Sequence, residues 1–135
     1  MTQSNDTPLV SIVIPTKDRV DLLRETIDSV RAQTYPRWEA AVCDDGSTDG
    51  TEAYMKQVAS EEPRIRYLQR EDGPNGASSR RNQGTRATTG EYVIYIDSDD
   101  VFEPTCLAGR VEAMRGDASV DFAVFRLGIF KQQPN

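Results

Sequence analysis

The chain has 135 residues, a length that suits one domain able to bury about two-thirds of the surface its unfolded form exposes. Hydrophobic residues at 37%, charged residues at 28%, nine glycines and seven prolines are typical of a soluble globular protein and exclude collagen-like and disordered classes. The formal net charge of −6 disfavours general nucleic-acid binding, which requires a basic face, so we expect no nucleic acid among the partners. No apolar stretch approaches the ~18 residues of a membrane span, and we expect a cytoplasmic protein.

Histidine is absent, which excludes Ser-His-Asp and Cys-His mechanisms and HExxH zinc sites. Any acid or base chemistry therefore falls to carboxylates. Cys43 and Cys106 lie far apart without CxxC spacing, so neither a zinc site nor a disulfide framework is expected. Cys43 lies in an apolar run, where a buried hydrophobic role is the simplest interpretation.

Short apolar runs bounded by turn residues predict five strands, at residues 10–15, 38–43, 65–69, 91–96 and 121–130. The first run is continuous and β-branched, which is typical of a strand buried on both faces.

Helices are expected between these strands. The first begins near Val20, has an apolar face at Leu23, Ile27 and Val30, and ends before Tyr35. Three more follow: one capped by Ser47 or Asp49 that runs to about Ser60, one at 77–88 weakened by Gly84, and one after Pro104. This alternation predicts an α/β fold, a mostly parallel sheet of about five strands with helices on both faces.

Charged and polar residues follow three of the predicted strands directly. Residues 15–19 follow the first strand, Asp44 and Asp45 the second, and residues 97–100 the fourth. In an open α/β sheet, ligands bind outside the carboxyl ends of the strands. Side chains from distant parts of the sequence are therefore expected to meet at one edge.

Asp97 and Asp99 are candidate metal ligands, because residues i and i+2 of an extended segment project to the same side. Clustered carboxylates favour a hard cation such as Mg²⁺ or Mn²⁺, whose shell a phosphorylated ligand completes. The alternative is a solvated acidic turn. Asp45 is either part of a simple turn or an acceptor for a base or ribose, and Arg80-Arg81 is either a solvated basic face or a phosphate-binding pair.

Two common nucleotide-binding fingerprints are missing. The first glycine is Gly46, after the second strand, so the glycine-rich turn of a dinucleotide-binding fold is absent from the first strand–helix junction. No GxxxxGK[ST] sequence occurs either. These absences leave nucleotide binding through a metal and carboxylates.

Three segments of the sequence resemble the amino-terminal half of family 2 glycosyltransferases of the GT-A fold. They are VSIVIPTKDR, DDGSTDGT from Asp44, and GASSRRNQGTRATTGEYVIYIDSDD ending at Asp100, in matching order and spacing over roughly residues 8–130. The resemblance implies one Rossmann-like domain in 1–135, with a flexible N-terminus at 1–8, a nucleotide-sugar-binding GT-A domain at 9–130, and no acceptor-binding half.

The resemblance also implies the roles of particular residues. Pro15 and Thr16 are expected to line the nucleotide pocket, Asp45 to contact the base, commonly uracil, and Arg81 to help hold the nucleotide. The implied substrate-binding residues are Pro15, Thr16, Asp18, Asp45, Arg81 and Asp97, and the implied ligands of Mn²⁺ or Mg²⁺ are Asp97 and Asp99. Two departures from the family pattern stand out: Lys17-Asp18-Arg19 replaces an aromatic-Asn-Arg segment, and Arg80 replaces a small residue.

The implied reaction is metal-dependent transfer of a sugar, with inversion, from a nucleoside diphosphate sugar to an acceptor hydroxyl. A UDP-sugar donor, a saccharide or lipid-linked acceptor and a role in polysaccharide biosynthesis are expected. The family's general base lies well beyond the DxD, and no convincing base is found after Asp100. We therefore expect a hexosyltransferase donor-binding half that is inactive or truncated as an isolated chain, with its catalytic residue unassigned.

Two other function classes are consistent with a small acidic α/β protein. A receiver-like signalling domain has a similar size and an acidic Mg²⁺-binding pocket, but its acidic pair follows the first strand, whereas Asp44-Asp45 follows the second here. A module that only binds a protein partner is the other, and it predicts no affinity for nucleotides.

Overall fold

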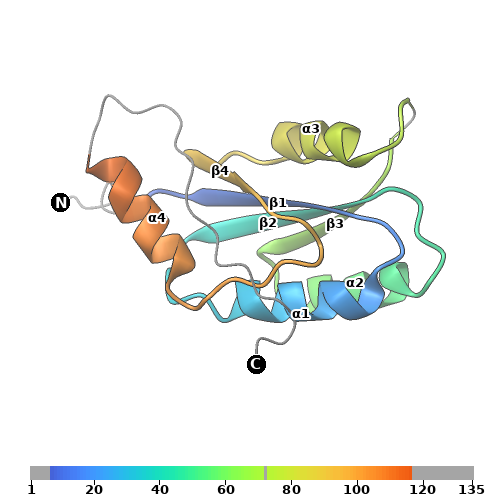
Figure 1. Cartoon of the computed structure of the whole chain (residues 1–135), viewed down its shortest axis with the longest axis horizontal. Coiled ribbons are helices and arrows are strands. Elements are labelled where there is room, and N and C mark those ends of the chain that lie inside the picture. Colours follow the sequence, from blue (N-terminus) through green and yellow to red (C-terminus); the bar gives the residue numbers. More distant parts are fainter. Residues whose placement is uncertain (1–6, 72, 117–135) are drawn as a thin grey trace.

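The computed structural model describes residues 7–71 and 73–116, and their four strands form one parallel sheet (Figure 1). The strands are β1 (Val10–Thr16), β2 (Trp38–Asp44), β3 (Ile65–Gln69) and β4 (Tyr92–Tyr95). Their order is β3-β2-β1-β4, and all three neighbouring pairs are parallel. The predicted parallel α/β sheet is confirmed for these four strands. The predicted strand at 121–130 lies outside the described residues.

Three helices connect these strands, namely α1 (Val20–Arg31), α2 (Thr51–Glu61) and α3 (Ala77–Ala87), and α4 (Cys106–Arg115) follows β4. Figure 1 shows α1 and α2 on one face of the sheet and α3 on the opposite face, as expected of right-handed crossovers. The N-cap of α2 is Gly50, so neither predicted cap residue occupies that position. Asp49 lies just before it, and its Oδ1 accepts the N–H of Thr51, whereas Ser47 Oγ donates to Asp44.

The strand order places β1 at a switch point of the topology. The chain moves outward from β1 through β2 to β3, and then returns to place β4 on the other side of β1. Crevices that bind ligands open at such points, beyond the carboxyl ends of the strands. A receiver-like domain has the order 2-1-3-4-5, with its third strand beside its first, so the observed order argues against that alternative.

The core lies on both sides of β1, every residue of which is buried. On the α1 and α2 face, Ile12 and Ile14 belong to the same apolar cluster as Leu23 and Ile27. On the other face, Val13 lies directly under α3, which approaches it at Gly84. Burial on both faces, as the apolar run predicts, fixes β1 as the rigid centre of the sheet. No helix of the described residues is long and apolar enough to cross a membrane.

Candidate functional site

The carboxyl ends of β1, β2 and β4 bring the predicted site residues to one edge of the sheet. Thr16, the last residue of β1, pairs with Asp44 at the end of β2, and its main-chain oxygen accepts the N–H of Asp45 at 2.9 Å. On the other side of β1, the N–H of Ile96 donates to the main-chain oxygen of Val13. This bond holds the end of β4 beside β1, immediately before Asp97. The predicted convergence at the strand ends is therefore present.

Residues 97–100, which we call the acidic turn, gather three carboxylates. The N–H of Asp100 donates to the main-chain oxygen of Asp97 at 3.1 Å, which closes a turn. One carboxylate oxygen from each of Asp97, Asp99 and Asp100 lies within 4.8 Å of the others. The expectation of an extended segment was wrong, because the turn rather than strand alternation brings these groups together. The turn also adds Asp100, which the sequence interpretation did not include as a ligand.

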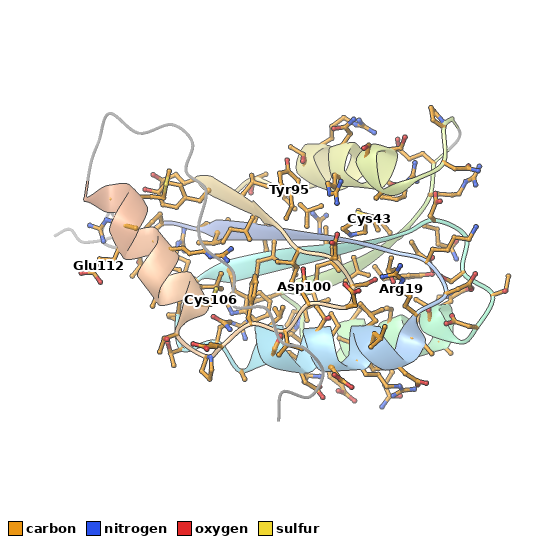
Figure 2. All side chains as sticks on the ribbon, in the orientation of Figure 1. Arg19, Cys43, Tyr95, Asp100, Cys106 and Glu112 are labelled. Carbon is orange, nitrogen blue, oxygen red and sulfur yellow. The ribbon has the colours of Figure 1, made fainter. Side chains whose placement is uncertain are left out.

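Two arginines from other elements balance part of this negative charge. Arg19 Nη1, from the loop after β1, lies 3.2 Å from Asp99 Oδ2, and Arg81 Nη2, from α3, lies 3.2 Å from Asp97 Oδ1. Figure 2 shows Arg19 and Asp100 on the same side of the sheet despite their separation in sequence. Burial, together with the charges of the other two aspartates, raises the pKa of Asp100. Excess negative charge thus remains in the turn.

The three carboxylates suit a hard divalent cation. Mg²⁺ binds oxygen at about 2.1 Å, so opposite ligand oxygens stand about 4.2 Å apart, and the 4.8 Å spread needs only small side-chain rotations. The side chains of Asp97 and Asp99 are 56% and 44% exposed, which leaves room for an ion, water and phosphate oxygens. The donor set therefore fits Mg²⁺ or Mn²⁺.

A second polar group lies at the end of β2, around Asp45. Asp45 is buried, its Oδ2 accepts the N–H of Gly76, and its Oδ1 lies 3.6 Å from Arg80 Nε. Neither Oδ1 nor Nε has a hydrogen-bond partner, and neither does the buried Thr16 Oγ1. Buried polar atoms without a hydrogen bond are rare in folded proteins, so these three, from the ends of β1 and β2 and from α3, indicate a place for polar ligand groups.

The two adjacent arginines of α3 have different environments. The Arg80 side chain is only 3% exposed, and its Nη1 donates to Gln83 Oε1 at 2.7 Å. A solvated basic face is therefore the wrong description of Arg80. Arg81 is partly exposed and reaches the acidic turn. The pair spans the distance between the Asp45 group and the acidic turn.

Asp18 joins two loops. Its φ of 51° lies in the left-handed region, its N–H donates to Ser47 Oγ at 2.7 Å, and its Oδ1 accepts the N–H of Thr48 at 2.7 Å. The carboxylate that the sequence assigns to substrate thus already holds the loop after β1 against the loop after β2. Pro15 and Thr16, the other two residues of this segment that the sequence assigns to substrate, are buried within β1.

Three buried polar side chains, two in α1 and one just beyond its end, were missed by sequence reasoning. Thr26 Oγ1 contacts the main-chain oxygens of Ser98 and Asp100, Ser29 Oγ accepts the N–H of Phe102, and Gln33 Oε1, just beyond the helix, accepts the N–H of Leu107. Their signal is uncharged polar residues at spacings of three and four along the border of the apolar face. This pattern indicates a helix that fastens another main-chain segment.

Comparison with known proteins identifies the family. The sequence profile of glycosyl transferase family 2 matches residues 11–133. The putative teichuronic acid biosynthesis glycosyltransferase TuaG of Bacillus subtilis (strain 168) is 35% identical over 111 residues, which cover 82% of this chain and 44% of TuaG. The chain thus spans less than half the length of this relative.

Solved structures show the same arrangement. TarS of S. aureus, residues 1–349, in complex with UDP-GlcNAc, superimposes with a TM-score of 0.72 at 26% identity, over 79% of this chain and 31% of that one. The mannosyltransferase PcManGT of Pyrobaculum calidifontis, in complex with GDP-Man and Mn²⁺, gives 0.71 at 30% identity, over 79% and 32%. The fold is that of the nucleotide-binding half of GT-A enzymes. The profile match over nearly the whole sequence establishes that this chain belongs to glycosyl transferase family 2.

Proposed function

We propose that the chain is the donor-binding half of a metal-dependent glycosyltransferase that takes a nucleoside diphosphate sugar, with a UDP-sugar as the first candidate. The observation that carries the proposal is the convergence of three carboxylates in the acidic turn, beside β1 at the switch point of the sheet. Complexes of structural neighbours with UDP-GlcNAc and with GDP-Man and Mn²⁺ support it.

The residues divide into a metal-binding part and a nucleotide-binding part. Asp97, Asp99 and Asp100 hold Mg²⁺ or Mn²⁺, and the bound ion supplies Lewis-acid stabilisation of the leaving diphosphate. Arg81 and Arg19 turn from their carboxylate partners toward the phosphates, because guanidinium groups bind phosphate oxygens well.

The nucleobase is placed beside Asp45 in this proposal. Its Oδ1, which makes no hydrogen bond and lies 3.6 Å from Arg80 Nε, accepts an N–H from the nucleobase. Thr16 Oγ1, at the end of β1, is a further donor without a hydrogen bond, and Pro15 precedes it in that strand. An acceptor of this kind suits the N3–H of uracil and rejects cytosine, which has no proton at N3. Asp18 supports the pocket from the loop after β1.

Transfer with inversion needs a general base for the acceptor hydroxyl, and we assign none among the described residues. The acceptor side belongs to the part of the enzyme that corresponds to the remaining length of its relatives. Because TuaG is named for teichuronic acid biosynthesis, we propose a saccharide or lipid-linked acceptor in polysaccharide biosynthesis. The isolated chain is expected to bind the donor without transferring sugar at an enzymatic rate.

Calorimetric titration with UDP, with and without Mn²⁺, tests the proposal. We expect binding that strengthens at least tenfold with the ion and that loses this dependence in Asp99→Asn, since a ligand is removed. Asp28→Asn is the matched control, because it removes the same charge from the exposed face of α1. The proposal would be contradicted if Mn²⁺ did not change the affinity for UDP, or if Asp99→Asn and Asp28→Asn lost the dependence on Mn²⁺ equally. Competition between UDP, GDP and CDP tests the uracil assignment.

A further inference from the structure

The acidic turn is fastened to the protein by one side chain of α1. Thr26 is fully buried, and its Oγ1 lies 2.5 Å from the main-chain oxygen of Asp100 and 3.0 Å from that of Ser98. These two oxygens flank Asp99 in the sequence. One hydroxyl therefore holds the main chain on both sides of a proposed metal ligand, donating to the two carbonyls as a shared, three-centre bond.

The other contacts of the turn are of a different kind. The bonds between Asp97 and Asp100 lie within the turn, and they fix its shape without fixing its position. The ion pairs with Arg19 and Arg81 join exposed side chains, and such pairs hold geometry weakly. The Thr26 hydroxyl is shielded from water and belongs to a rigid helix packed on β1.

We propose that Thr26 is a positioning residue for the metal: it sets where the carboxylates of the acidic turn stand, without touching the ion. This inference rests on the proposed function, since it concerns the metal that the acidic turn would bind. The three carboxylate oxygens, now within 4.8 Å of one another, must move slightly closer to reach the spacing of a coordination shell. If the turn were free to shift, ordering it on binding would weaken the affinity for the metal. Partners that orient metal ligands from outside the first shell typically change metal affinity by ~10- to 100-fold.

The same helix offers a matched control. Ser29 Oγ accepts the N–H of Phe102 at 3.1 Å and donates to the main-chain oxygen of Thr26 at 2.7 Å. Like the Thr26 hydroxyl, it is buried, lies on the same face of α1 and contacts the chain that follows β4, but it holds that chain at Phe102, beyond the acidic turn. Loss of either hydroxyl should lower stability, whereas only loss of the Thr26 hydroxyl should loosen the ligands.

The test measures Mn²⁺ binding by electron paramagnetic resonance in the presence of saturating UDP, together with thermal unfolding. In Thr26→Val the shape of the side chain is kept and the hydroxyl is lost, and we expect Mn²⁺ affinity to fall about tenfold. In Thr26→Ser the hydroxyl is kept and a buried methyl group is lost, so the melting temperature falls while affinity stays within about twofold of the wild type. Ser29→Ala should lower the melting temperature and leave affinity unchanged.

Three results would overturn the inference: wild-type affinity in Thr26→Val, an equal loss of affinity in Ser29→Ala, or a tenfold loss in Thr26→Ser. The last keeps the test decisive even where the valine variant does not fold. If the wild-type chain binds no Mn²⁺ with UDP, the proposed function fails and the inference with it. If the wild-type chain binds both and Thr26→Val binds Mn²⁺ equally well, the inference alone fails.

Discussion

Replacing Gly84 by alanine separates local helix propensity from packing. Alanine favours a helix interior over glycine by about 1 kcal/mol, so propensity alone predicts that Gly84→Ala stabilises α3. The structure predicts the opposite, because a Cβ at this position would lie 2.4 Å from Val13 Cγ1, 3.1 Å from Cys43 Sγ and 3.2 Å from Val13 Cγ2. The absence of a side chain is what lets α3 rest on β1 and β2.

The size of the effect follows from these distances. Carbon atoms pack at about 3.8 Å, so the closest contact falls short by about 1.4 Å. Val13 cannot turn away, because it is fully buried, its two γ-carbons both face the new methyl group, and its χ1 is stiff. α3 must therefore lift by about 1 Å. Overpacking of this kind costs up to about 3 kcal/mol, and subtracting the gain in propensity leaves a net destabilisation of about 2 kcal/mol.

Urea unfolding measures the change in the free energy of unfolding, and Gly109→Ala is the control. Gly109 lies in α4, where a Cβ meets nothing within 4 Å, so the same substitution should stabilise by up to about 1 kcal/mol. Because α3 carries Arg81, lifting it should also weaken UDP binding in Gly84→Ala and leave it unchanged in Gly109→Ala. A Gly84→Ala chain as stable as the wild type would refute the reasoning.

Three further outcomes are expected. Arg19→Gln should bind Mn²⁺ about two- to threefold more tightly without nucleotide, because it removes a charge 3.2 Å from a carboxylate of the acidic turn; a paramagnetic resonance titration measures this. Hydrogen bonds from Thr51 and neighbouring N–H groups lower the pKa of Asp49. Its carboxylate therefore stabilises the fold at pH values above the ordinary pKa of 3.8, and this contribution is lost as the pH falls through the lowered pKa. Urea unfolding at several pH values should show a shallower loss of stability in acid for Asp49→Asn than for the wild type. Burial raises the pKa of Cys43 to about 11, so in Cys106→Ser a thiol reagent at about pH 8 should react only as fast as the chain unfolds.

Local patterns predict the elements well, because each strand and helix carries its own periodicity. The apolar run at Ile65–Gln69 yields β3 with both ends correct, and the spacing of Leu23 and Ile27 yields the buried face of α1. The order of the strands in the sheet cannot be predicted from such local patterns, because the side of the sheet on which a crossover returns depends on how whole helices pack. Gly84 shows the same limit: it reads as a weak point in a helix until the neighbouring sheet is known.

The candidate site was predictable to the extent that topology alone brings residues together. Parallel strands end at one edge, so Asp45 and Asp97 must both lie at that edge, on the two sides of β1 once the strand order is known. The turn that adds Asp100 depends on hydrogen bonds within four residues, which the pattern Asp-Ser-Asp-Asp does not distinguish from an extended strand end. The burial of Arg80 depends on a partner, Asp45, from a different element, and no local signal reports that pairing.

The segment from the end of β1 through α1 supports both parts of the site. Asp18 and Ser47 join it to the loop after β2, on the side of Asp45, whereas Thr26 joins it to the acidic turn. One rigid segment, whose inner face is buried against β1, would therefore position both ends of a nucleoside diphosphate that extends from Asp45 to the acidic turn. The exposed Arg19 differs, since it can leave its carboxylate at little cost. The fold thus separates the positions of the proposed metal ligands, which are fixed, from the arginine counter-charges, which can move, so the proposed cation would enter without rebuilding the acidic turn.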